Sequence, residues 1–126
     1  MAIDSIFDDV IEETTATPPI TVLREVAQVL EKKTQGLLTG EVEQYIQGGR
    51  VKLHFKINAP SLNNYSYEVV RAKHPLCFYP LTIEKMSSDD IEVQNQEEFE
   101  KELKKVFSSK KVKDVINGLL AQIKAA

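Results

Sequence analysis

The sequence has 126 residues, 42% of them hydrophobic and 28% charged, which is typical of one globular domain with its own core. A net charge of −3 and the lack of any long apolar run argue against a membrane-spanning segment and against a generally basic nucleic-acid binder. The single cysteine, Cys77, excludes an internal disulfide and a multi-cysteine zinc site, and the acidic start does not resemble a secretory signal. We therefore expect a small cytoplasmic protein that uses no metal or other cofactor.

The first 17 residues form a segment that differs in charge from the rest of the chain. They hold five acids and no base, so they carry −5 and leave +2 of the total of −3 on residues 18–126. Ile3, Phe7 and Val10 recur at helical spacing, which predicts a short amphipathic helix or an arm that becomes helical on contact. We expect this arm over residues 1–17 and a single domain over residues 18–126.

Three arrangements of the arm remain open on the sequence alone. It packs on its own domain, stays disordered, or binds a partner chain, including a second copy in a homodimer. Residues 14–19 end in two prolines and are expected to be a linker or a helix cap, because proline suits the start of a helix and not its interior.

A helix is predicted first in the domain, over residues 20–34. Its apolar positions follow helical spacing, and Gly36 stands where a left-handed C-terminal residue is favoured. A strand is expected within residues 38–46, followed by Gly48 and Gly49, which favour a tight hairpin turn. The next strand, residues 50–57, alternates strictly between apolar and polar side chains, so one face must be buried and the other wet.

Two further strands and two helices are predicted in the second half of the chain. The strands cover residues 65–73 and 77–83, with Cys77 counted among the buried side chains, and residues 91–93 allow a brief fifth strand. Asn95 and Ser109 are expected to cap the helices that follow. The predicted fold class is α+β: an antiparallel four-stranded meander, preceded by one helix and followed by two helices that pack on one sheet face.

The wet face of residues 50–57 is the sharpest candidate for a functional surface. If Ile57 pairs with Tyr65, His54 lies opposite Glu68 and the large apolar side chains share the core side. The wet face then contributes Arg50, Lys52, His54 and Lys56 as polar candidates for partner binding, and Arg71 of the next strand is added to them. An exposed histidine–carboxylate pair with no Ser or Cys nucleophile beside it does not favour catalysis, and a solvated sheet face remains the plain alternative.

We therefore expect a non-catalytic interaction protein, such as an adaptor, a small chaperone or an immunity-type inhibitor. The basic face would attract an acidic protein partner, and Ile3, Phe7 and Val10 would supply apolar anchors. One alternative is an anion-binding or nucleic-acid accessory protein, although the expected face lacks aromatic side chains for stacking. Another is a small ligand-binding protein or enzyme whose pocket lies between the sheet and the first helix. Its candidate lining residues are Tyr45, Tyr67 and Tyr79.

Overall fold

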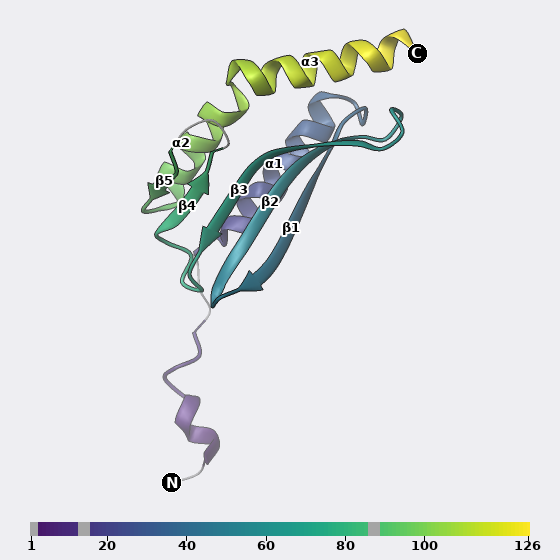
Figure 1. Ribbon diagram of the computed structural model, residues 1–126. Helices are drawn as coiled ribbons and strands as arrows, with labels where there is room; N and C mark the ends of the chain where they lie inside the picture. The colour runs from purple at the N-terminus through teal and green to yellow at the C-terminus, as the bar shows by residue number, and fades with distance from the viewer. Residues whose placement is uncertain (1–2, 13–15, 86–88) are drawn as a thin grey trace.

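A single antiparallel sheet organises the chain, and Figure 1 shows its strands in the computed structural model. The structure describes residues 3–12, 16–85 and 89–126. Within them lie a short 3-10 helix, three α-helices and five strands: η1 (Ile3–Phe7), α1 (Pro19–Lys33), β1 (Thr39–Gln47), β2 (Arg50–Ala59), β3 (Tyr65–His74), β4 (Leu81–Glu84), β5 (Ile91–Val93), α2 (Gln96–Phe107) and α3 (Lys110–Ala125). The strands follow one another in the sheet in chain order. The α+β class is confirmed, with five strands in place of four.

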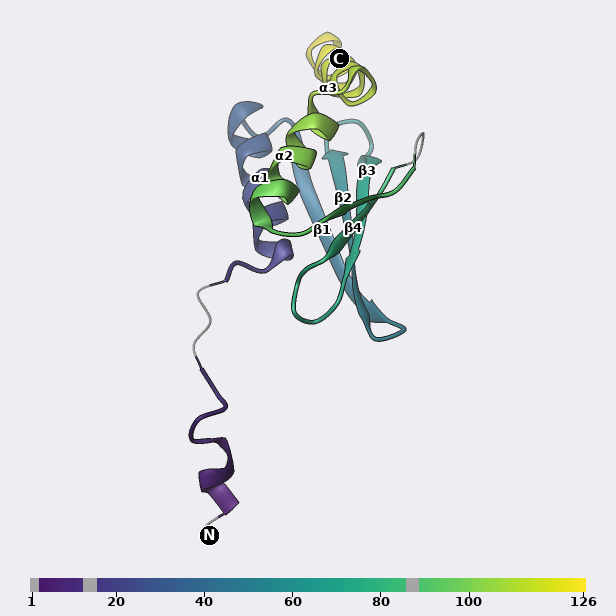
Figure 2. The ribbon, with the colours of Figure 1, turned by 90° about the vertical axis from the view of Figure 1, so that its left-hand side faces the viewer.

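The phase of β2 divides the two faces of the sheet. Odd-numbered residues from Val51 to Ala59 are buried, and the even-numbered residues between them are only half-buried. Figure 2 shows α1 and α2 side by side on one face, while α3 crosses above the end of the sheet. Phe55, Leu23 and Phe99 are among the fully buried core side chains, so the alternation predicted for this strand is confirmed.

Helix α1 rests directly on β1 at a glycine. A Cβ atom at Gly40 would lie 2.5 Å from the Cβ of Ala27 and 2.9 Å from the ring of Phe55. Any larger residue at this position would push the helix away from the sheet, because packed interiors leave no room for an added methyl group.

Turn and cap residues lie where the sequence predicts them. Gly48 and Gly49 both have positive φ angles, as a two-residue hairpin turn requires. The Asn95 side chain accepts a hydrogen bond from the Glu98 backbone N–H at 2.9 Å, and Ser109 caps α3 in the same way. Side-chain caps satisfy backbone donors that the first helical turn leaves unpaired.

The β2–β3 register differs from the predicted one. Ile57 lies opposite Tyr67 rather than Tyr65, and the register shifts between Phe55 and Lys56 because Val69 is an extra residue on β3. Without this bulge the pairing would turn Arg71 and Lys73 toward the core. With it, the buried residues are Val70, Ala72 and His74.

The strand predicted from Cys77 onward begins four residues later, at Leu81. Between β3 and β4 the chain makes a turn in which the Phe78 backbone N–H bonds the Pro75 carbonyl at 3.0 Å, and the Tyr79–Pro80 peptide is cis. Two prolines remove backbone donors from this stretch, so it cannot continue the ladder. Cys77 is therefore exposed, and the expectation that it is buried is wrong.

The N-terminal arm lies apart from the sheet and its helices in Figure 1. Its helical part is the single short 3-10 helix η1, and Phe7 and Val10 are 55% and 67% exposed. Residues 14 and 15 of the predicted linker, and residues 1, 2 and 13 of the predicted arm, lie outside the described residues. Helix α1 begins at Pro19, which agrees with a proline at the helix start.

Candidate functional site

The face of the sheet opposite the helices carries all the polar candidates predicted from the sequence. Arg50, Lys52, His54 and Lys56 project from β2, and Arg71 joins them from β3, where it lies opposite His54. The corrected register therefore brings the basic residues together but separates His54 from Glu68, which lies opposite Lys56. The expected histidine–carboxylate pair is wrong.

Acidic side chains lie among these bases. β1 places Glu41 opposite Lys56 and Glu43 opposite His54 on the same face, and β4 places Glu84 opposite Arg71. Pairing within the β2–β3 hairpin alone does not reveal the acids of β1, Glu41 and Glu43. The tight Gly48–Gly49 turn sets the β1 register, and extending it along the strand would have found them.

Ion pairs neutralise much of the positive charge of this face. Lys56 bonds Glu43 at 2.8 Å, Arg71 forms an ion pair with Glu68, and Lys73 lies 3.8 Å from Glu84. The hydrogen bond from Lys56 lowers the pKa of the Glu43 carboxyl, and the bond from Arg71 lowers that of Glu68. The face therefore carries both positive and negative side chains and is not a uniformly basic surface.

Two bases at the β1–β2 end of the sheet remain unneutralised. Arg50 and Lys52 form no ion pair within the part of the chain that the structure describes. Lys52 lies opposite Tyr45, which is 44% exposed, and the adjacent Ile46 is 66% exposed on the helix side of the sheet. We call these four side chains the hairpin patch.

The hairpin patch projects beyond the helices. In both Figure 1 and Figure 2 the β1–β2 turn extends past the start of α1, so no helix covers the patch. The Tyr45 hydroxyl lies 3.3 Å from His54 Nε2, and the two rings meet edge to face with their centres 5.4 Å apart. This contact holds the tyrosine ring over β2 at the open side of the sheet.

The apolar candidates of the arm do not join the sheet face. Ile3, Phe7 and Val10 are exposed, and the N-terminal segment that carries them lies apart from the sheet in Figure 1. The structure thus places the predicted anchors and the predicted charges in two separate groups.

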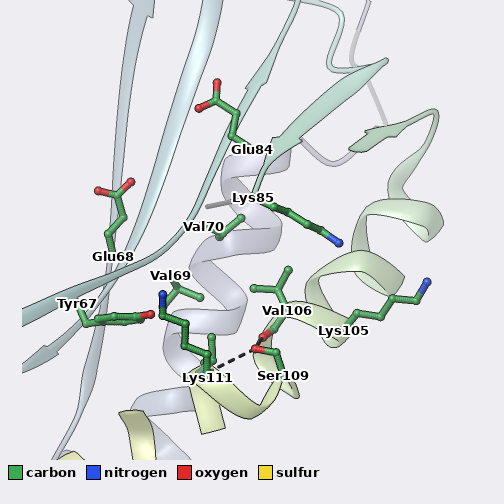
Figure 3. Close-up of a pocket in the computed structure, with 11 residues that line it drawn as sticks. Tyr67, Glu68, Val69, Val70, Glu84, Lys85, Lys105, Val106, Ser109 and Lys111 are labelled. Atoms are coloured by element: carbon green, nitrogen blue, oxygen red, sulfur yellow. Dashed lines mark hydrogen bonds between the residues drawn. The ribbon is translucent and has the colours of Figure 1, made fainter. Parts of the chain in front are cut away.

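A hollow of about 250 Å³ lies between β3–β4 and the junction of α2 with α3 (Figure 3). Tyr67 and Val106 line it, and Lys85, Lys105 and Lys111 stand around it. Lys85 and Lys105 both contact Glu102, which satisfies their charges. Tyr45 and Tyr79 do not line this hollow, so the three candidate tyrosines do not share one pocket.

The described residues offer neither a cluster of metal ligands nor a helix that could cross a membrane. No group of three or more His, Cys, Asp or Glu side chains there could hold a metal ion. No helix in that part of the chain is long and apolar enough to cross a membrane. Comparison with known proteins finds no family model, curated protein or solved structure that matches this chain.

Proposed function

We propose that this chain is a non-catalytic module that binds another protein and that the hairpin patch is its main contact. One observation supports this proposal above all. Tyr45 and Ile46 are exposed at the end of a projecting hairpin, beside the unpaired bases Arg50 and Lys52. Tyrosine and arginine are enriched among the residues that dominate binding energy at protein interfaces. The end of the hairpin offers Tyr45, Arg50 and Lys52 on the outer face and Ile46 on the opposite face, so a partner that encloses this end contacts all four side chains.

The partner in this proposal carries acidic side chains at its contact surface. Arg50 and Lys52 form no ion pair with any carboxylate of the described residues, so they supply the attraction. Lys56 and Arg71 are already paired with Glu43 and Glu68. In the proposed complex they therefore contribute contact area more than net charge. The exposed anchors of the arm, among them Phe7, provide a second apolar contact.

Nucleic acid is a weaker candidate for this surface. Glu41 and Glu43 lie on the same face and would repel phosphates, and Tyr45 alone offers an aromatic ring beside the unpaired bases. The proposal includes a cytoplasmic location. Its support is the free, exposed Cys77, which suits a reducing compartment.

A charge-reversal experiment tests the role of the patch. Tagged chain would be used to capture and crosslink partners from the native host, comparing wild type with the double variant Arg50→Glu/Lys52→Glu. The matched control is Lys101→Glu/Lys113→Glu, which makes the same charge change at exposed positions of α2 and α3. We expect the patch variant to lose most of the captured protein and the control to retain it.

Two outcomes would contradict this proposal. Equal capture by the patch variant and the control would show that the patch does not bind the partner. Recovery of nucleic acid in place of protein, with a steep loss of binding as salt rises, would favour the accessory-protein alternative.

A further inference from the structure

β1 is an open edge of the sheet. It pairs with β2 on one side only, and in Figure 1 no other element lies along its free side. The strand is nine residues long, pairs with β2 without a register shift and contains no Lys, Arg or Pro. The opposite edge, β5, has only three residues. Natural sheets protect their edges with short strands, bulges, proline or charged side chains, especially lysine. β1 is long and regular, and its charged residues are Glu41 and Glu43, both on the outer face.

We propose that two copies of the chain pair through this edge. Their β1 strands run antiparallel about a two-fold axis at Gln44 and join the two five-stranded sheets into one. Every second residue of an edge strand turns its backbone N–H and C=O groups outward, and the second copy would satisfy these groups. The inference stands on the free backbone edge and does not require the proposed binding of an acidic partner.

The side chains of β1 select this register. Directly opposite residues of an antiparallel pair lie on the same face, so only alternate registers keep apolar residues together. With the axis at Gln44, Val42 faces Ile46 of the second copy on the helix side. On the outer face Glu43 meets Tyr45, and Glu41 meets Gln47, so no two like charges lie opposite each other.

Neighbouring registers are less favourable. An axis at Glu43 places the two Glu43 carboxylates opposite each other, and an axis at Val42 places Glu41 opposite Glu43. An axis at Tyr45 avoids like charges but sets Ile46 against Gln44. Of the axes from Val42 to Tyr45, only Gln44 places Ile46, which is 66% exposed in the single chain, against an apolar side chain of β1. An axis at Ile46 would set the two Ile46 side chains opposite each other, but it would leave residues 39–43 of both strands without a partner.

The unpaired bases of the hairpin patch favour the same arrangement. Lys52 lies opposite Tyr45, and in the dimer Tyr45 would lie opposite Glu43 of the second copy. The backbones of Lys52 and that Glu43 would then be two strand spacings apart, which is roughly 10 Å. Long side chains can span that separation. Arg50 relates to Glu41 of the second copy in the same way, through Gln47.

The helices leave room for this pairing. α1 meets β1 at Gly40, whereas Gln44 and Ile46 are exposed on the same side of the sheet. Gly40 is four residues from the axis, so the two Gly40 contacts would lie eight residues apart along the paired strands, roughly 27 Å. The two α1 helices therefore approach opposite ends of the joined edge.

A crosslinking experiment reads the register directly. In the full chain with Cys77→Ser, the variant Gln44→Cys places two thiols directly opposite each other, roughly 5.5 Å apart between Cα atoms, within the range of a disulfide. The control Gln47→Cys places its two thiols roughly 20 Å apart along the strands. We expect a covalent dimer from Gln44→Cys under mild oxidation and none from Gln47→Cys.

Sedimentation of the unmodified chain over a range of concentrations tests the pairing without a crosslink. We expect a monomer–dimer equilibrium that Ile46→Glu weakens at least tenfold and that Phe7→Ser/Val10→Ser leaves unchanged. Circular dichroism checks that each variant is folded. A chain that is monomeric throughout, a dimer lost on changing the arm but not Ile46, or crosslinking through Tyr45→Cys instead of Gln44→Cys would each overturn the inference. A monomer that binds an extended segment of a different protein along β1 would also overturn it. Ile46→Glu and Tyr45→Cys change members of the hairpin patch, so the proposal for Arg50 and Lys52 is judged separately, by the capture experiment with Arg50→Glu/Lys52→Glu, in which β1 is unaltered.

Discussion

At the scale of single residues, the contacts that hold the layers together are specific and few. Gly40 lets α1 lie against β1, and Tyr79 packs against the core with a hydroxyl that has no hydrogen-bond partner among the described residues. Neither fact is visible in a hydrophobicity pattern. From the sequence, a glycine within a strand indicates only a weaker strand, and a tyrosine indicates only a large, partly polar side chain.

The close approach at Gly40 gives the first residue-scale prediction. Gly40→Ala should lower the free energy of unfolding by about 1–3 kcal/mol, because the added methyl group would overlap Ala27 and Phe55. The matched control is Gly118→Ala in α3, where nothing lies within 4 Å of the added carbon. There the same change should stabilise the chain by about 0.5–1 kcal/mol through helix propensity. Urea unfolding measures both, and equal effects at the two positions would contradict the packing argument.

Tyr79 gives the second residue-scale prediction. Burial, with a smaller contribution from the Glu100 carboxylate, raises the pKa of its hydroxyl above the ordinary value. The unfolded chain therefore ionises first, and the stability that depends on the neutral phenol is present below pH of about 10 and is lost as the pH rises beyond it. Tyr79→Phe has no such group. We expect it to match or exceed wild-type stability at pH 7 and to lose less between pH 9 and 11, as followed by urea unfolding. A parallel decline of both proteins would show that Tyr79 makes no contribution.

At the scale of elements, spacing and turn residues predict where the helices and strands lie. They do not predict how neighbouring strands pair. The helices, the Gly48–Gly49 turn, the Asn95 cap and the face of β2 follow from spacing and turn chemistry. The bulge at Val69 does not. It exists because β3 must direct Tyr67 inward before it and Ala72 inward after it, and one extra residue changes the phase between them.

The same limit explains the error in the candidate site. Alternation within β2 correctly predicted which side chains lie outside, but the charge of a sheet face depends on the neighbouring strands. Glu43 and Glu68 reach the bases of β2 and β3 through the register and the bulge. A basic strand with neighbours on both sides therefore does not make a basic surface. The unpaired charges are found at the β1–β2 end, where Arg50 and Lys52 form no ion pair with a described residue.

At the scale of the whole molecule, the chain has a layered domain and an arm that lies apart from it. The domain buries its apolar residues between the sheet and the helices, whereas the apolar residues of the arm from Ile3 to Ile11 are exposed. Because these apolar side chains stay exposed, they contribute little burial free energy to the folding of their own chain. Their contribution to free energy comes only when another surface covers them.

This separation predicts how the arm behaves when it is altered. Ile3→Ser/Phe7→Ser/Val10→Ser should leave the thermal unfolding midpoint almost unchanged, because these side chains are exposed and do not belong to the core of the domain. The same variant should reduce capture of the protein partner, since it removes the apolar contact while retaining every charge. Differential scanning calorimetry and the capture experiment measure the two effects on one preparation. If the variant instead unfolds at a distinctly lower temperature, the arm packs on its own domain in solution, and its proposed role as a contact for a partner is wrong.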